Sequence, residues 1–351
     1  RFKSNSNGNQ NRQVQEFLYY IEPERKYISQ RIKKYDKVSD TFQTSMFKRE
    51  NNSSKGIYDK RNQLNELTGK EWLYRTNSVE ISNTTPEELR LIDFITEIEE
   101  TKYSTNGKEG FSHKLRRIHP SPKPPQLMKK IIEFFTKENG MIFDPFMGVG
   151  GTLLGASLIN RNAIGIDLSK EYIDIYKEVC KRENIKEQLA IIGNSKEINN
   201  IEEISDIQFD LILTDPPYGD MMNKKKTGEA TKRGKNTNPT PFTNNPEDLG
   251  NYPLPVFLEE LKKIITSSIE KLKDKKYVVI FCKDFQPTPR YNGLLHSDIV
   301  GKLTEIDNLF FKGYKIWYDK TINLFPYGYP YSYISNQLHQ YILIFQKRNL
   351  K

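Results

Sequence analysis

The sequence predicts an α/β fold in which a mostly parallel sheet of about seven strands is covered by helices. From residue 111 onward, short apolar runs alternate with stretches of helical periodicity. Such alternation is typical of parallel strands joined by right-handed crossovers. A glycine-rich turn follows the first apolar run, and two consecutive prolines follow the fourth. Since α/β sheets bind ligands at the carboxyl ends of their strands, these two turns are the candidate site.

Composition narrows the class of protein. The chain has 351 residues, enough for one large domain or two smaller ones, and a net charge of +9 that favours a polyanionic partner. Its two cysteines, Cys180 and Cys282, cannot form a disulfide framework, which predicts a cytoplasmic location. No apolar run reaches the ~18 residues of a membrane span and no signal peptide opens the chain, so no membrane association is expected.

Residues 1–110 are expected to form a basic, mostly helical N-terminal extension that ends in the polar loop Thr101–Gly110. Residues 1–56 contain 12 Lys/Arg and 6 Asp/Glu, so +6 of the net +9 lies there. Apolar residues recur at roughly helical spacing from Val14 to Val38, with an interruption at Pro23 that favours two helices. The extension is either a solvated helical segment or one that contacts a partner.

Residues 111–351 are expected to form the α/β domain, with a polar insert at 221–250 whose lysine-rich part, Lys224–Lys235, either meets phosphate groups or stays solvated. Each expected strand is a short apolar run, and each expected helix repeats apolar residues every three or four positions. The strands are Met141–Asp144, Ala163–Asp167, Leu189–Gly193, one containing Leu211–Leu213, Tyr277–Phe281, Gly313–Tyr318 and Gln340–Phe345; the helices are Gln126–Lys137, Gly151–Asn160, one through Tyr172 and Tyr176, Leu254–Leu272 and Leu294–Ile306.

The glycine-rich turn, Phe143–Thr152, lets the backbone approach a ligand closely. A dinucleotide fingerprint needs a third glycine where Leu153 stands, so a pyrophosphate cradle is not supported. The second strand ends in Asp167, which can accept hydrogen bonds from both hydroxyls of a ribose. A nucleoside-bearing cofactor without pyrophosphate is therefore expected, and S-adenosylmethionine fits.

The proline turn, Asp215-Pro216-Pro217-Tyr218, ends the fourth strand in a stiff, extended conformation. The Asp215 carboxylate and the adjacent prolyl carbonyl are two acceptors that suit a planar group carrying an NH₂. Tyr218 offers a ring on which that group can stack. Taken in isolation, the motif is equally compatible with a plain strand–turn bearing a surface aspartate.

Together, the two turns and the upstream segment His119–Pro125 resemble the motifs of the S-adenosylmethionine-dependent amino-methyltransferases that modify adenine N6 or cytosine N4 in DNA. The resemblance is strong over residues 113–220 and loose to residue 348. It implies a Rossmann-like methyltransferase fold, S-adenosyl-L-methionine as cofactor, double-stranded DNA with a flipped-out target base, and a place in restriction-modification. The basic extension then becomes a candidate for contacting DNA, or for joining a homodimer or a partner subunit.

Carried over by position, the resemblance implies the site residues. Asn194 stands where the family usually has Asp, and an aspartate in the first position of the proline motif goes more often with adenine than with cytosine. No metal is expected, because the four histidines (His113, His119, His296 and His339) lack metal-ligand spacing. The implied catalytic residues are Asp215, Pro216, Pro217 and Tyr218; the implied cofactor-binding residues are Asp144, Pro145, Phe146, Gly148, Gly150, Thr152, Asp167, Asn194, Lys123 and Pro124.

Several alternatives stay open. The chain could methylate cytosine N4, or guanine N2 in RNA, or it could be a non-catalytic nucleic-acid-binding subunit. Methylation of cytosine C5 is disfavoured, since neither Cys180 nor Cys282 follows a proline as that nucleophile usually does. The alternating tyrosines from Tyr327 to Tyr333 favour core packing, with base stacking as the other interpretation.

Overall fold

The computed structural model describes residues 51–52, 56–76, 79–82, 111–223, 241–288, 291–319 and 335–349. Most of the extension, the lysine-rich loop Lys224–Lys235 and the tyrosines Tyr327–Tyr333 lie outside the described residues. None of the described helices is long and apolar enough to span a lipid bilayer.

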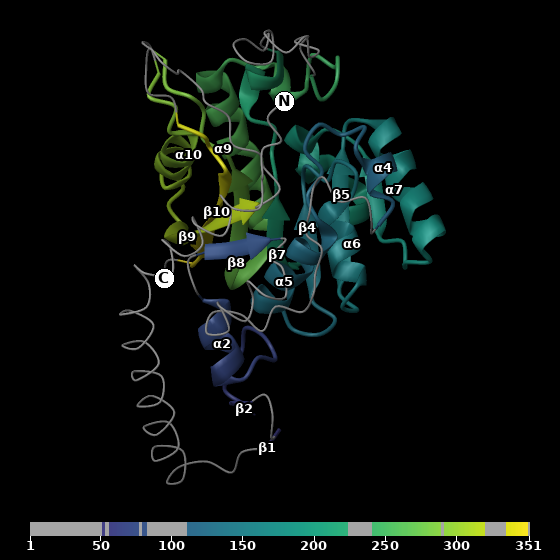
Figure 1. The fold of residues 1–351 in the computed structure, drawn as a ribbon, viewed down its shortest axis with the longest axis vertical. Helices are drawn as coiled ribbons and strands as arrows, with labels where there is room; N and C mark the ends of the chain where they lie inside the picture. Colours follow the sequence, from purple (N-terminus) through teal and green to yellow (C-terminus); the bar gives the residue numbers. More distant parts are fainter. Residues whose placement is uncertain are drawn as a thin grey trace, which may run out of the picture.

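An eight-stranded sheet forms the centre of the molecule, in the order β3-β9-β10-β8-β7-β4-β5-β6 (Figure 1). Strand β10 is antiparallel to both of its neighbours, and the other pairs in the sheet are parallel. The predicted Rossmann-like α/β fold is therefore confirmed. The strands are β3 (Val79–Ser82), β4 (Met141–Asp144), β5 (Asn162–Asp167), β6 (Leu189–Ile192), β7 (Phe209–Thr214), β8 (Leu272–Cys282), β9 (Leu309–Asp319) and β10 (His339–Lys347).

Helices cover both faces of the sheet (Figure 1). Helices α5 (Pro125–Phe135), α6 (Gly151–Ser157) and α7 (Lys170–Glu183) pack on one face; α9 (Leu254–Glu270) and α10 (Leu295–Leu303) pack on the other. The remaining elements are short: α2 (Gly69–Arg75), α4 (His113–Arg116), the 3-10 turns η1 (Ser195–Asn200), η2 (Glu202–Ile204), η3 (Gly219–Asn223) and η4 (Leu249–Asn251), and the strand pair β1 (Asn51–Asn52) and β2 (Gly56–Ile57).

The central strands are buried on both faces, and this explains their unbroken apolar runs. In β7, Leu211 and Leu213 contact the core beneath α5 and α6, whereas Ile212 contacts the core beneath α9. Side chains alternate in the same way along β8, where Val279 and Phe281 belong to the core beneath α5 and α6. Both strand faces thus contribute to holding the carboxyl end of β7 in place.

The described part of the extension contributes to the sheet. Strand β3, which precedes residue 110, pairs in parallel with β9, so the extension adds an eighth strand to the seven from residues 111–351. The described part also contains the short helix α2 and the strands β1 and β2, and the helical character of the rest stays a prediction. The helical pattern missed β3 because a four-residue edge strand is too short to show a period.

The order of strands creates a crevice above β4 and β7. Strand β4 pairs with β5 on one side, the next strand in the chain, and with β7 on the other, so the direction of winding reverses between β4 and β7. Ligands of open α/β sheets bind outside the carboxyl ends of the strands at such a reversal. The glycine-rich turn follows β4 and the proline turn follows β7, so both lie at this crevice.

Candidate active site

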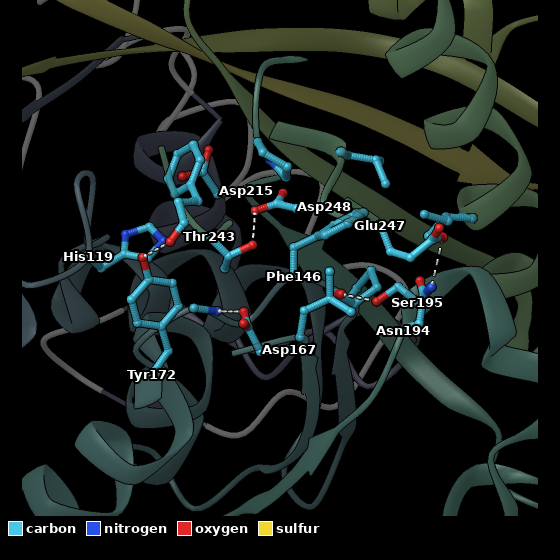
Figure 2. Close-up of a pocket in the computed structure, with 17 residues that line it drawn as sticks. His119, Phe146, Asp167, Tyr172, Asn194, Ser195, Asp215, Thr243, Glu247 and Asp248 are labelled. Atoms are coloured by element: carbon cyan, nitrogen blue, oxygen red, sulfur yellow. Dashed lines mark hydrogen bonds between the residues drawn. The ribbon is translucent and has the colours of Figure 1, made fainter. Parts of the chain in front are cut away.

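A cavity lies at the carboxyl ends of β4, β5 and β7 (Figure 2). In Figure 2, His119, Tyr172 and Asp215 lie toward one end of this cavity, and Asn194, Ser195 and Glu247 toward the other. Asp215 and Gly148 also line a smaller adjoining cavity together with Lys123, Asp144 and Thr152. The two turns singled out in the sequence therefore face common spaces.

Two glycines shape the turn after β4, for different reasons. Gly148 has φ +50°, and a Cβ there would lie 3.0 Å from Nε2 of His119. Gly150 has φ +75°, and its Cβ would lie 2.2 Å from Cδ2 of the buried Tyr176. Gly148 lines both cavities, whereas Gly150 lines neither. Gly150 is thus required by the packing of this turn against α7.

Asp167 is held at the end of β5 by two backbone hydrogen bonds. The N–H of Gly148 donates to Oδ2 and the N–H of Ser169 donates to Oδ1, both at 2.8 Å. Burial raises the pKa of Asp167 to about 7, although these hydrogen bonds oppose the rise. Each oxygen keeps a lone pair for a ligand in the cavity, which suits a pair of ribose hydroxyls.

Asp144 braces the ends of β4 and β7 against each other. Its Oδ1 accepts from the hydroxyl of Thr214 at 2.7 Å and from the N–H of Phe146 at 3.1 Å. Burial raises its pKa to about 6, and the hydrogen bonds from Thr152, Thr214 and Phe146 oppose this. Asp144 therefore supports the geometry of both turns in addition to lining the smaller cavity.

Both carboxylate oxygens of Asp215 are engaged. Nζ of Lys123 donates to Oδ2 at 2.5 Å, and the hydroxyl of Tyr218 donates to Oδ1 at 2.6 Å. Burial, followed by the charge of Asp215, raises the pKa of Tyr218 well above its usual value, so this hydroxyl stays protonated. The structure thus places Lys123, which the resemblance implied for the cofactor, on the aspartate of the proline motif.

His119 is a neutral wall of the site. Burial lowers its pKa to about 3, and the charges of Lys123 and Arg116 lower it further. Nδ1 accepts from the N–H of Ser121 at 3.2 Å, so the neutral ring carries its proton on Nε2, next to Gly148. The rings of Tyr172 and Phe242 lie against His119, with centroids 4.9 and 5.1 Å away.

The segment after the proline motif closes one side of the cavity, which the sequence did not indicate. The hydroxyl of Tyr172 on α7 donates to the carbonyl of Phe242 at 2.6 Å, and the hydroxyl of Thr243 donates to Asp248 at 2.7 Å (Figure 2). Asp248 in turn caps η4 through the N–H of Gly250. In the sequence, neither Phe242 nor the turn Asp248-Leu249-Gly250 indicates a part of the site. Their place becomes visible only in the structure, where Phe242 contacts Tyr172 of α7.

Asn194 is the N-cap residue of η1, and it also lines the cavity. Its Oδ1 accepts from the N–H of Lys196 at 3.0 Å, while Nδ2 lies 3.5 Å from a carboxylate oxygen of Glu247. An aspartate at position 194, which the family usually has, would be repelled by the carboxylate of Glu247. The neutral amide of Asn194 avoids this repulsion.

The cysteines are buried thiols. Burial is the first cause that raises the pKa of Cys282 well above its usual value, followed by the charges of Asp284 and Asp215. Burial also raises the pKa of Cys180. A protonated, buried thiol is a poor nucleophile, which supports the rejection of cysteine chemistry. Among the described residues, no cluster of His, Cys, Asp and Glu could hold a metal ion.

The structure thus gathers most of the implied residues around two adjoining cavities and leaves four outside them. Pro216 is buried behind the turn, Tyr218 contacts the cavity through Asp215, Pro124 caps α5, and Gly150 packs on Tyr176. The residues that line one or both cavities are Lys123, Asp144, Pro145, Phe146, Gly148, Thr152, Asp167, Asn194, Asp215 and Pro217.

This arrangement fits S-adenosylmethionine. Asp167, Phe146 and Asn194 line the cavity, where they would offer acceptors to a ribose, an aromatic wall and an amide for an adenine edge. The turn after β4 lacks the third glycine of a dinucleotide fingerprint, so a pyrophosphate cradle is not supported.

Comparison with known proteins agrees with the geometry. A family model described as DNA methylase matches residues 1–178, half of the chain, and one described as RMKL-like methyltransferase domain matches residues 135–233. The chain is 31% identical over 116 residues to the tRNA (guanine(10)-N2)-dimethyltransferase of Pyrococcus abyssi, a match covering 32% of this chain and 34% of that protein.

It is also 44% identical over 66 residues to the Type II methyltransferase M2.DpnII of Streptococcus pneumoniae, a match covering 19% of this chain and 25% of that protein. The matches thus span about a quarter to a third of these relatives. With the family match extending over half of the sequence, the chain belongs to the DNA methylase family of S-adenosylmethionine-dependent amino-methyltransferases.

Proposed function

We propose that this chain is a site-specific DNA methyltransferase that methylates adenine N6 of a base flipped out of the duplex. The proposal rests on one observation: Asp215, at the end of β7, and Gly148, in the turn after β4, line the same cavities. An acceptor for an amine and a cradle for the methyl donor therefore lie on one rim of the sheet. A duplex base cannot reach such a recess without leaving the stack.

The chemistry follows from the weakness of the nucleophile. The lone pair of an aromatic amine is delocalised into its ring, and S-adenosylmethionine, when bound, supplies an electrophilic methyl group on a sulfonium sulfur. Asp215 would accept an N–H of the amine and favour a pyramidal nitrogen, whose lone pair would then be free to attack the methyl carbon. The N–C bond forms as the C–S bond breaks. The nitrogen then loses a proton that has become acidic, so no strong base is needed.

Guanine N2 in RNA is the second candidate substrate. The tRNA (guanine(10)-N2)-dimethyltransferase of Pyrococcus abyssi matches a longer stretch of this chain than M2.DpnII does, 116 residues against 66. The same acceptors would orient any exocyclic amine, and cytosine N4 is a further candidate for that reason. We favour DNA because the match that covers half of the chain is to a DNA methylase family.

We propose in addition that residues 1–110 form an extension that contacts DNA or a second subunit. Its first 56 residues carry 12 Lys/Arg against 6 Asp/Glu. Basic segments of this kind neutralise backbone phosphates and strengthen binding irrespective of base sequence. Removal of residues 1–50 should then weaken DNA binding and flatten its salt dependence, measured by fluorescence anisotropy, and leave cofactor affinity unchanged.

The function is tested by product analysis. The protein is incubated with methyl-labelled S-adenosylmethionine and, separately, duplex DNA or tRNA, and the nucleosides are separated after digestion. N6-methyladenine from DNA supports the proposal, whereas N2-methylguanine from tRNA or N4-methylcytosine from DNA supports an alternative. Asp215→Ala should lose transfer by roughly 10²-fold or more while still binding cofactor, and Asp206→Ala at an exposed position serves as the matched control. Full turnover by Asp215→Ala would refute the assigned role.

A further inference from the structure

Lys123 is a buried lysine whose ammonium group is committed to the active site. Its side chain is 4% exposed, and its Nζ lies 2.5 Å from Oδ2 of Asp215. The rings of Phe281 and Trp317 lie 5.3 and 5.9 Å from the same nitrogen, close enough for cation–π attraction. The backbone is held as well, because the guanidinium of Arg116 donates to the carbonyl of Lys123.

Asp215 has a different partner on each oxygen. Oδ2 contacts a charged ammonium that is enclosed by aromatic rings, and Oδ1 contacts the neutral hydroxyl of Tyr218. Both hydrogen bonds are charge-assisted because the acceptor is a carboxylate, but the ammonium adds the attraction of a full opposite charge, which the hydroxyl lacks. The hydroxyl on Oδ1 is therefore the easier partner to replace.

We propose that Lys123 is the positioning residue for Asp215: it holds Oδ2 through the ion pair, so that Oδ1 is the oxygen at which the target amine replaces the hydroxyl of Tyr218. This inference rests on the proposed amine methylation. It assigns Lys123 to the orientation of the amine acceptor rather than to the cofactor, where the sequence motif had placed it. Release of the hydroxyl also frees the ring of Tyr218 to move toward the incoming base.

The charges around Asp215 explain why a cation is needed. Asp144 on β4 faces it as a like charge, and Cys282 at the end of β8 faces it as a neutral thiol. The neighbours of Lys123 are the neutral ring of His119 and the ammonium of Lys283, whose pKa is lowered by burial and by Lys123. Without Lys123, the partly buried carboxylate of Asp215 would stand near Asp144 with no cation in contact, and nothing would hold its Oδ2 in one orientation.

The first test compares Lys123→Met with Lys137→Met, which removes a lysine just beyond the far end of α5, where Nζ lies 3.5 Å from the hydroxyl of Tyr58. Lys123→Met should lower kcat by about 10²-fold. The dissociation constant for S-adenosylmethionine, measured by calorimetry, should change by less than about threefold. Lys137→Met should match the wild type in both kcat and cofactor affinity. A kcat within threefold of wild type, or a loss explained wholly by weaker cofactor binding, would overturn the proposal.

The second test needs no turnover, so it separates this inference from the proposed function. The melting temperatures of Lys123→Met, Asp215→Asn and the double variant form a mutant cycle. Because Lys123→Met leaves a partly buried carboxylate without a cation, Asp215→Asn should raise the melting temperature in that background while lowering it in the wild type. Shifts that simply add would refute the coupling. A wild type that methylates no nucleic acid amine would instead refute the proposed function while this cycle still reports on the pair.

Discussion

Gly150→Ala offers a quantitative test of why the turn after β4 needs its second glycine. Gly150 has φ +75°, and a left-handed conformation costs a residue with a Cβ about 1–2 kcal/mol. The added Cβ would lie 2.2 Å from Cδ2 of Tyr176, a ring that is fully buried. That ring cannot swing aside freely, since its hydroxyl accepts from the N–H of Gln188 at 2.8 Å.

Overpacking of this kind costs typically about 1–3 kcal/mol, so the free energy of unfolding should fall by about 2–5 kcal/mol in total. Urea unfolding followed by circular dichroism measures the change. In a Tyr176→Ala background the steric part disappears and only the backbone part should remain, about 1–2 kcal/mol. The protein that stays folded should bind S-adenosylmethionine with nearly wild-type affinity, because Gly150 lines neither cavity.

Two results would contradict this reasoning. A loss of less than about 1 kcal/mol would show that the turn relaxes around the new methyl group. An equal loss in both backgrounds would show that Tyr176 is not the obstacle. Gly148→Ala provides the comparison, since its Cβ would meet the edge of His119 at 3.0 Å and Gly148 does line the cavities. That variant should affect cofactor binding as well as stability.

Four further predictions concern the cavity and the buried groups near it. Burial raises the pKa of Asp167 to about 7 and that of Asp144 to about 6. Their contribution to stability is therefore full below pH ~4 and is lost as the pH rises through these values. Urea unfolding from pH 4 to 8 measures this loss. Cofactor affinity should instead increase from pH 6 to 8, since ionised Asp167 is the better acceptor for hydroxyls; calorimetry should find a flatter profile for Asp167→Asn, and an identical profile would remove Asp167 from the ribose site. Tyr172→Phe, which loses the hydrogen bond to Phe242, should speed cofactor dissociation by roughly 2- to 10-fold in stopped-flow fluorescence, and an unchanged rate would show that this contact does not hold the cavity wall. Cys282→Ala should retain methyl transfer in the radiolabel assay, because burial keeps this thiol protonated; abolished transfer by a folded variant would reopen cysteine chemistry.

Local patterns in the sequence were sufficient to predict seven strands of the sheet and the two turns. The strand carrying Asp167 and the strand before Asp215 are apolar runs buried on both faces, and such runs keep their identity whatever they pack against. Pro216 and Pro217 stop a strand by their covalent structure alone. The edge strand β3 was missed because its four residues are too few to show a period, and its pairing partner, β9, lies more than 200 residues away.

Contacts between distant segments decided what each site residue does. Lys123 and Asp215 are 92 positions apart, and Tyr172 and Phe242 are 70 apart. No period or spacing within either segment encodes these meetings, which depend on how α5, α7 and the end of β7 pack around one sheet. The sequence by itself determined which chemical groups are present at the strand ends. Only the tertiary structure decided that the lysine contacts the aspartate and that one of two glycines serves packing, since burial and direction are properties of the packed chain.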